Sequence, residues 1–501
     1  MLKAAQVFSS NMVLQRDKNV LVWGEGDNGR TVTVSFNGVS RSADVKDSKW
    51  QVKLPPMQAG EESEMTVTDG TDTLTFYNII VGEVWFLGGQ SNMELELQNA
   101  KDGAEYLSQL DENTPVRYYY TPKVATAEQA QQQGENSGWS KAGSESSKAW
   151  SAVGFHFGMK LAKELGVTVG LIGCNWGGTS ASSWMDRKTL ENDRTISSYI
   201  EEYDEKIKGK TPEQQKAEYE DYLKYEAKWN EDQQRIMAQE PDLGWDQLQE
   251  RIGKNLWPGP INEFNPFRPT NMFENMVMRV CPYTIKGFLY YQGESDDHKP
   301  DSYYRLFTSL IALWREKWGD DTLPFIMVQL PMFKYAADPD YKHWCKIRSA
   351  QMKAYRTVKN TGIAVILDCG EFNEIHPKDK LPVGERLFMQ AMELCYGGWE
   401  NAYAPMLKRV VYDNGKAKLS FCHAENGFDV KGEKAAGFCI AGADGEFKEA
   451  EADIQGSSII LSSPEVADPE YVSWCWYNYA EVTVFGKNGI PLAPFNTFEE
   501  H

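Results

Sequence analysis

One serine follows a short apolar run that ends in two glycines, a position where a chain can present a nucleophile. Residues 83–97 read EVWFLGGQSNMELEL, which places Ser91 two residues after Gly89. In one interpretation the serine caps the helix after a strand-to-helix turn. In the other, the turn holds a nucleophilic serine clear of a sheet, beside helix N–H groups. The Gly-x-Ser-x-Gly elbow is absent, so the rest of the chain must supply the base and the oxyanion donors.

A general base with a pKa near neutrality is usually a histidine, and the chain has six. Four are poorly placed, in a helical pattern, at a helix approach, in a C-terminal β region and at the chain end: His156, His343, His423 and His501. His298 follows QGESDD, whereas His376 lies in the loop LDCGEFNEIHPKDKLPVGERL after a strand-like run. Such a loop can reach a nucleophile on the first strand, and Glu371 and Glu374 can orient the ring. We therefore predict His376 as the base.

Three of the strand-like runs end in polar, glycine-containing turns: GGQSN, NWGGTS and QGESD. Ligands of open α/β sheets bind beyond the carboxyl ends of the strands, so these turns are expected to converge on one site. A metal site is a second interpretation of the last turn, with these residues as ligands: Glu294, Asp296, Asp297 and His298. The cluster lacks a distant second set of ligands, and we do not expect a metal there.

The order of elements predicts an α/β protein with β regions at both ends. Residues 1–80 alternate apolar and polar residues between Gly, Asn and Asp turns, which predicts a small β-sandwich. In residues 81–398, apolar runs alternate with helical stretches, which is typical of a parallel sheet layered with helices. A charged insertion at about 186–256 predicts a helical hairpin with a solvated face; a wall of the cleft is the alternative. Residues 399–501 predict a terminal β module, with packing on the first β region as one arrangement.

Composition excludes several classes of protein. The 501 residues carry a net charge of -20, which argues against a nucleic-acid partner. No apolar run approaches the roughly 20 residues that span a bilayer, so no membrane partner is expected. The N-terminus has no signal-peptide pattern; the protein is cytoplasmic, or periplasmic or secreted if a leader was removed. Eight cysteines without a CxxC pair predict buried thiols, and oxidation of a few pairs stays open.

Four motifs occur in order along the chain: GGQSNME, NWGGTSASSW, GFLYYQGESD and NEIHPKDK. Together they resemble the four blocks of the sialate O-acetylesterase branch of the SGNH (GDSL-type) hydrolases, which includes related carbohydrate acetylesterases. VFSSNMVLQRDKNVLVWGEG and NGIPLAPFNTF resemble the terminal regions of that family. The resemblance therefore covers nearly the whole chain apart from the charged insertion. It implies a three-layer α/β sandwich with a parallel sheet, flanked by β-sandwich modules.

The resemblance also implies roles for single residues. Ser91 is expected to be the nucleophile and His376 the base. The oxyanion donors are expected to be the Ser91 N–H, a glycine of Gly177-Gly178 and the side chain of Gln292, where SGNH hydrolases commonly have Asn. The family often has Asp three residues before the histidine. This chain has Asn373 there, so Glu374, or a backbone carbonyl, is expected to support the imidazole.

The expected activity is transfer of an acetyl group from a sugar to water through an acetyl-serine intermediate, without metal or cofactor. By resemblance, the substrate is an O-acetylated sialic acid, and acetylated xylan or another hemicellulose is the alternative. Arg348 and Lys378 are candidate contacts for an anionic sugar. A non-catalytic carbohydrate-binding protein is a further alternative, which the presence of the expected catalytic residues disfavours, and a peptidase is a remote one.

Overall fold

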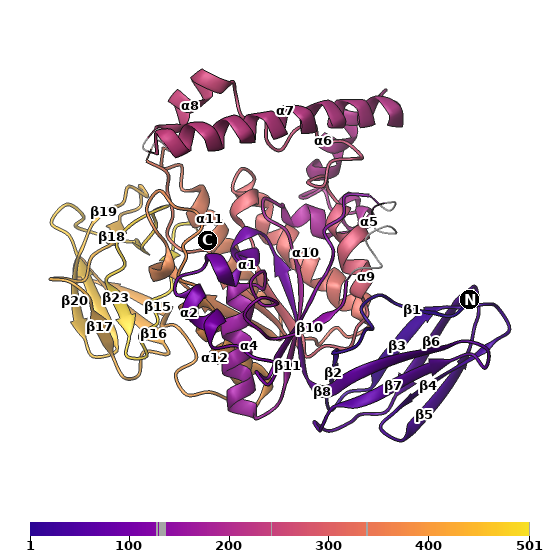
Figure 1. The fold of residues 1–501 in the computed structure, drawn as a ribbon. Coiled ribbons are helices and arrows are strands. Elements are labelled where there is room, and N and C mark those ends of the chain that lie inside the picture. The colour runs from indigo at the N-terminus through magenta and orange to yellow at the C-terminus, as the bar shows by residue number, and fades with distance from the viewer. Residues whose placement is uncertain (127–128, 130–136, 242, 337–338, 500–501) are drawn as a thin grey trace. The chain divides into compact units, whose positions relative to one another are not determined.

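The computed structural model describes residues 1–126, 129, 137–241, 243–336 and 339–499. Its backbone forms two compact units (Figure 1). The first unit contains residues 1–121, 137–181 and 279–499, and the second contains residues 182–278 with the described part of 122–135. Both termini of the described chain belong to the first unit, which also contains every residue of the expected catalytic site.

The first unit is built around one mixed sheet. Its central strands run in the order β10-β9-β11-β8-β12-β13-β14, and all neighbours are parallel except β10 and β9. The strands are β8 (Thr73–Gly89), β9 (Val116–Tyr120), β10 (Trp139–Lys141), β11 (Val169–Asn175), β12 (Gly287–Tyr291), β13 (Phe325–Gln329) and β14 (Thr361–Val365). The parallel strands read as nearly continuous apolar runs because helices cover both of their faces.

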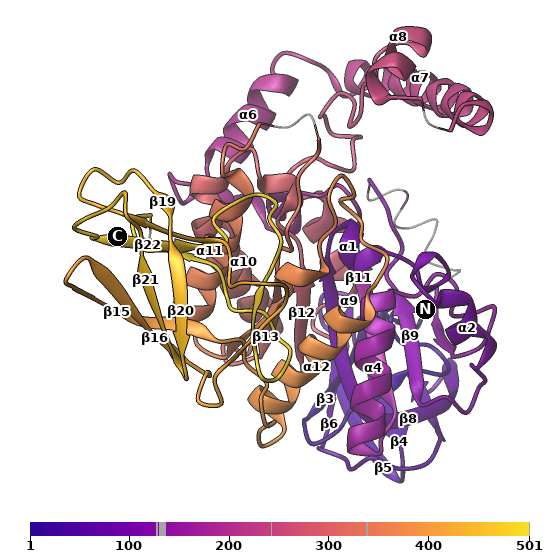
Figure 2. The same ribbon diagram turned by 90° about the vertical axis from the view of Figure 1, so that its left-hand side faces the viewer.

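The helices of this unit lie on opposite faces of the sheet. They are α1 (Ser91–Glu94), η1 (Leu97–Asn99), α2 (Gly103–Ser108), α4 (Ala152–Leu165), α9 (Met278–Val280, which begins in the second unit), η5 (Glu294–Asp296), α10 (Pro300–Trp318), α11 (His343–Thr357), η6 (Leu367–Cys369) and α12 (Leu381–Cys395). Successive residues of a strand point to opposite faces. Accordingly, Trp85 packs on Phe157 of α4, whereas Phe86 packs on Trp314 of α10. With α4 beside α12 and α10 beside α11, the expected three-layer α/β sandwich is confirmed (Figure 2).

The N-terminal β region is joined to this sheet by one continuous strand. Its strands are β1 (Lys3–Ala4), β2 (Val13–Gln15), β3 (Val20–Glu25), β4 (Thr31–Phe36), β5 (Val39–Asp44), β6 (Lys49–Leu54) and β7 (Ser63–Thr68). The first half of β8 pairs with β7, and its second half pairs with β11 and β12. The domain boundary expected at residue 80 therefore falls inside a strand. Sequence periodicity missed this continuity because β8 changes from half-buried to fully buried along its length.

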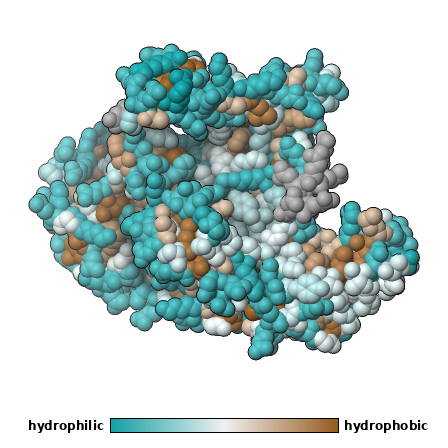
Figure 3. Space-filling view, in the orientation of Figure 1, coloured by the Kyte–Doolittle hydropathy of each residue, from teal (hydrophilic) through white to brown (hydrophobic). Residues whose placement is uncertain are grey.

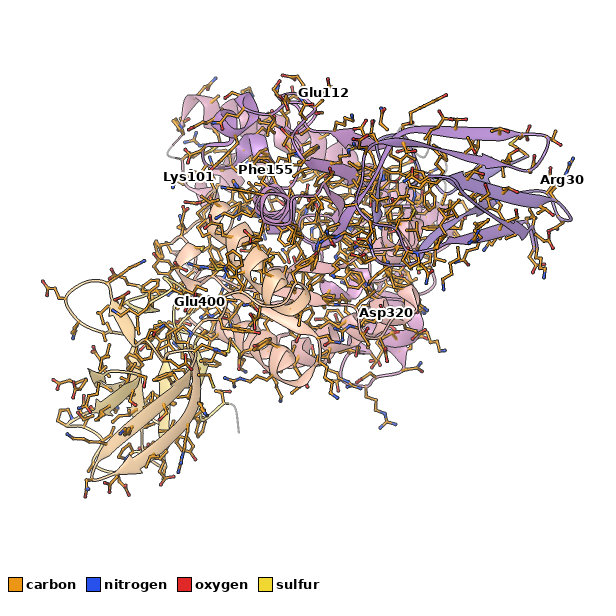
Figure 4. The ribbon with its side chains drawn as sticks, turned by 90° about the horizontal axis from the view of Figure 1, so that it is seen from below. Arg30, Lys101, Glu112, Phe155, Asp320 and Glu400 are labelled. Carbon is orange, nitrogen blue, oxygen red and sulfur yellow. The ribbon has the colours of Figure 1, made fainter. Side chains whose placement is uncertain are left out.

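The C-terminal region forms antiparallel sheets, as expected for a β module. Its strands are β15 (Met406–Asp413), β16 (Lys416–Cys422), β17 (Phe428–Val430), β18 (Phe438–Ala441), β19 (Lys448–Glu449), β20 (Glu451–Gln455), β21 (Ser458–Ser462), β22 (Tyr471–Trp474), β23 (Val484–Gly486) and β24 (Phe495–Asn496). Asn478 of this module accepts the Trp344 N–H at the start of α11, and its carbonyl accepts the Phe333 N–H. The module thus contacts the loop between β13 and α11. Figure 4 shows Arg30 at the tip of the N-terminal β region, away from Glu400 at the start of the C-terminal module.

The second unit is helical and contains the charged insertion. Its helices are η3 (Ala181–Trp184, which begins in the first unit), α5 (Arg187–Glu191), α6 (Ser198–Ile207), α7 (Pro212–Gln239), α8 (Trp245–Ile252) and η4 (Phe273–Val277). Thr211 and Gln214 form a capping box at the start of α7. The buried residues of α7 are Gln215, Tyr222 and Trp229, spaced by seven, so one narrow stripe packs and the rest is solvated. The unit is longer than the expected 186–256 at both ends.

The surface seen in Figure 3 is mostly hydrophilic, in keeping with the net charge of -20. None of the described helices is both long and apolar enough to span a bilayer.

Candidate active site

Ser91 is the first residue of α1, directly beyond the carboxyl end of β8. Gly89 has φ +133°, and a side chain there would collide with the Tyr291 carbonyl, whose oxygen accepts the N–H of Gln90. The tight approach of β12 to this turn therefore requires glycine. The neighbouring turns after β11 and β12 contain Gly177 and Gln292, so the three polar turns end at the same edge of the sheet.

His376 reaches Ser91 from the loop between β14 and α12. Its Nε2 lies 2.8 Å from the Ser91 Oγ, although 285 residues separate the two in sequence. The loop is held by the Lys101–Asp379 ion pair (2.8 Å) and by the Lys101 N–H, which donates to the Lys378 carbonyl. Lys101 is labelled in Figure 4. The structure thus brings together the serine and the histidine that the sequence singled out. Their catalytic roles stay predictions.

The environment of His376 lowers the pKa of its imidazole below the usual value. Loss of water around the ring is the main cause; the carboxylate of Glu374 opposes it, and the charge of Lys380 adds to it. A lowered pKa keeps the ring neutral at neutral pH. In the tautomer protonated at Nδ1, Nε2 accepts the Ser91 Oγ–H, which is the arrangement required of a general base.

The carboxylate of Glu374 does not hold the imidazole as the sequence suggested. Its Oε1 accepts the backbone N–H of His376 at 2.7 Å, and the ring Nδ1 has no hydrogen-bond partner among the described residues. Asn373 has φ +64° and accepts the Ala336 N–H through Oδ1. The chain therefore presents a Ser-His pair. Glu374 shapes the loop and contributes its charge.

The candidate oxyanion donors differ in their availability. The Gly177 N–H donates to the Glu94 carboxylate at 2.5 Å. Gln292 donates both carboxamide hydrogens inward, to the Thr179 carbonyl (3.2 Å) and to Asp296 Oδ2 (2.6 Å). In this geometry neither the Gly177 N–H nor the Gln292 carboxamide faces a reacting carbonyl.

The backbone N–H groups of Ser91 and Gly178 have no partner within the part of the chain that the structure describes. They remain the candidate donors. The residue types at these positions were predictable from the motifs, whereas the partner that each N–H already binds was not.

The sequence patterns did not predict a buried polar network that lies beneath the nucleophile. Asn92 donates to Glu294 Oε1 (2.7 Å) and to the Ile375 carbonyl (2.9 Å), and its Oδ1 accepts the ammonium of Lys380 (2.6 Å). Burial raises the pKa of Glu294 and lowers that of Lys380 to about 8. Asn92 thus joins the turn of Ser91 to the turn after β12 and to the residue before His376. The three side chains of this network belong to the motifs QSNM, QGES and HPKDK, in which other residues are predicted to be catalytic.

Two alternatives from the sequence do not match the structure. Asp296 accepts hydrogen bonds from Ser180, Ala181 and Gln292, and Glu294 binds Asn92, so these carboxylates serve in the packing of the turns and not as a ligand set. Arg348, a candidate contact for an anionic sugar, is fully buried. It donates to the carbonyls of Pro331 and Tyr477 and is therefore part of the core. Lys378, the other candidate, is exposed.

Comparison with known proteins gives consistent results. The chain matches a family model described as "Carbohydrate esterase, sialic acid-specific acetylesterase" over residues 81–241 and 259–392. It is 26% identical to the sialate O-acetylesterase of Mus musculus over 455 residues, which is 83% of this chain and 78% of that protein. The Homo sapiens sialate O-acetylesterase is also 26% identical, over 78% of this chain and 71% of that protein.

A solved structure agrees with the fold over its full length. The crystal structure of a carbohydrate acetylesterase from Xanthomonas citri superposes with a TM-score of 0.78 and 28% identity, covering 99% of both chains. The family match spans more than half of the chain and includes the nucleophile turn, the turns after β11 and β12, and the histidine loop. The chain therefore belongs to the sialic acid-specific acetylesterase family and is a carbohydrate esterase.

Proposed function

We propose that this protein removes acetyl groups from O-acetylated carbohydrates through an acetyl-serine intermediate on Ser91. The observation that carries the proposal is the 2.8 Å contact between Ser91 Oγ and His376 Nε2 at the carboxyl edge of the sheet. This contact pairs a nucleophile with a base whose lowered pKa keeps it neutral.

The mechanism has two acyl-transfer steps. His376 Nε2 takes the proton of Ser91 Oγ as the oxygen attacks the acetyl carbonyl, and the backbone N–H groups of Ser91 and Gly178 receive the oxyanion. The protonated imidazole then gives its proton to the departing sugar oxygen. Water attacks the acetyl-serine by the same route and releases acetate.

An O-acetylated sialic acid is the first candidate substrate. Support comes from the names of the mammalian relatives, at 26% identity. The second candidate is a neutral sugar such as an acetylated xylo-oligosaccharide. The carboxylates of Glu94 and Glu374 lie close enough to His376 to influence its pKa, and the expected cationic contact Arg348 is buried. These negative charges would repel an anionic sugar, whereas they would not repel a neutral sugar.

Acetate release from the two candidate substrates tests the proposal. The protein is incubated with 9-O-acetylated sialic acid and, separately, with acetylated xylo-oligosaccharides, beside the Ser91→Ala variant. We expect release from at least one substrate. We expect turnover to fall by on the order of 10⁴-fold or more in Ser91→Ala, because the nucleophile is gone.

The pattern of acetate release decides between the two candidate substrates. Release from the xylo-oligosaccharides alone keeps the mechanism and replaces the first candidate with the second. Equal activity of wild type and Ser91→Ala, or no release from either sugar, contradicts the proposal. Circular dichroism of the variant shows whether it has folded.

A further inference from the structure

Three exposed aromatic side chains lie on loops of the first unit. Phe372 is 50% exposed, Tyr335 43% and Tyr479 37%. The rings of Phe372 and Tyr479 touch, with centroids 5.4 Å apart and planes at 59°. Single exposed apolar residues are ordinary. A touching exposed pair with a third ring on an adjoining loop is a surface feature that needs an explanation. We call these three residues the aromatic rim.

The rim is held by hydrogen bonds of its backbone neighbours. Asn373, next to Phe372, donates its N–H to the Lys334 carbonyl (2.9 Å) and accepts the Ala336 N–H (3.2 Å). It therefore hydrogen-bonds the residues on both sides of Tyr335. Asn478, next to Tyr479, is tied to Phe333 and Trp344. The rings are therefore presented from fixed loops, which reduces the entropy lost when a ligand packs on them.

The rim is close to the catalytic pair. Phe372 precedes His376 by four residues, which limits the separation of their Cα atoms to about 14 Å. Glu371 and Glu374 form an isolated β-bridge across the same turn, which shortens that path. Tyr335 follows β13 and Phe372 follows β14, so both lie at the carboxyl edge of the sheet, where β8 delivers Ser91.

From this geometry we infer that the aromatic rim is a subsite for a pyranose ring of the substrate, beyond the sugar that carries the acetyl group. The inference rests on the proposed function. Aromatic faces pack on the C–H faces of sugars, and the Tyr hydroxyls can bond sugar hydroxyls. Exposed Glu371 and the partly exposed Lys334 lie beside the rim and supply further polar partners. The C-terminal module thereby contributes Tyr479 to substrate binding.

Specificity ratios test the subsite. For each enzyme, kcat/KM is measured on a glycan ester (an acetylated xylo-oligosaccharide or 9-O-acetylated sialyllactose) and on an aryl ester without sugar, 4-nitrophenyl acetate. In Phe372→Ala and Tyr479→Ala, we expect the ratio of the glycan ester to the aryl ester to fall about ten-fold, mainly through KM. Phe372→Tyr should restore it. Tyr77→Ala, which removes a 54% exposed ring on the N-terminal half of β8, is the matched control.

A binding measurement separates this inference from the proposed function. Xylohexaose and 3′-sialyllactose are titrated into the Ser91→Ala protein by calorimetry, with and without Phe372→Ala. Weaker binding of either glycan in the double variant supports the subsite even where turnover is absent. Unchanged ratios in Phe372→Ala and Tyr479→Ala, together with unchanged binding in the double variant, overturn it. Equal losses on the glycan and aryl esters also overturn it, because they indicate a structural role.

Discussion

The imidazole of His376 lies between opposing electrostatic influences. Loss of water lowers its pKa, and the nearby carboxylates of Glu374 and Glu94 raise it again. Only the neutral ring can accept the serine proton, so kcat/KM should decline as the pH falls through this lowered pKa. Activity should therefore persist below pH 6.5, the ordinary pKa of histidine.

We predict that Glu374→Gln moves the acid limb of the pH profile to lower pH. The substitution removes a charge that favours the protonated ring, while the amide oxygen can still accept the His376 N–H. Hydrolysis of the aryl ester 4-nitrophenyl acetate, followed from pH 4 to 8, gives the profile of kcat/KM, with Glu371→Gln as the control on the same turn. If Glu374 were instead the third member of a triad, kcat would fall by on the order of 10⁴-fold at every pH.

At the scale of elements, Asn92 joins three turns that are far apart in sequence. Its partners Glu294, Ile375 and Lys380 are separated from it by 202, 283 and 288 residues. Lys380 and Glu294 are both buried, and each relies on the asparagine for a hydrogen bond. The bond to the Ile375 carbonyl fixes the backbone directly before the base. The network therefore serves both stability and the alignment of His376.

We predict that Asn92→Asp lowers both stability and kcat, and that a second substitution, Glu294→Gln, separates the two effects. The new carboxylate cannot donate to Glu294 or to the Ile375 carbonyl, which should cost about 1.5–3 kcal/mol in the free energy of unfolding. It should also lower kcat by on the order of 100-fold through misalignment of the base. Adding Glu294→Gln supplies a donor to the new carboxylate, so stability should recover while kcat stays low.

Denaturant unfolding and steady-state kinetics measure the two quantities. Asn99→Asp, on the exposed side of η1, is the control. Recovery of kcat together with stability in the double variant would show that the Ile375 bond is not needed for alignment.

The sequence predicted the fold to the extent that local patterns determine it. The alternation of apolar runs and helical stretches indicated the parallel sheet, and helical periodicity placed His156 in packing. His156 is indeed buried against Tyr106 and Phe155, which lowers the pKa of its ring to about 4. Continuity of β8 was not predictable, because Asn78 and Gly82 are turn-type residues inside the strand and its pattern changes from half-buried to fully buried, as it would at a boundary between two elements.

The candidate site was predictable in its members and not in its hydrogen bonds. A serine after a double glycine and a histidine in a late loop are visible as residue types. The amide hydrogens of Gln292 already bind Thr179 and Asp296, and the N–H of Gly177 already binds Glu94. These donors and acceptors come together only when the turns converge in the folded chain. The same holds for Arg348, whose burial follows from contacts with Pro331 and Tyr477.

At the scale of the whole molecule, the net charge of -20 acts on any charged substrate. We predict that the kcat/KM of the enzyme acting on 9-O-acetylated sialic acid rises about two- to five-fold between 10 and 200 mM NaCl, because salt screens the repulsion of an anion. Acetylated xylo-oligosaccharides, which are neutral, are the control and should show no change. A decrease with salt for the sialic acid would mean that a local cation such as Lys378 outweighs the net charge.

The unbroken strand β8 also bears on how such an enzyme can change over evolutionary time. Its first half belongs to the N-terminal β region and its second half carries the chain to Ser91. Recombination therefore has no linker within this strand at which it could replace the N-terminal β region by another domain. A cut at residue 80 would remove the pairing of β2 and β7 from the strand that carries the nucleophile. The N-terminal region is thus inherited with the catalytic centre.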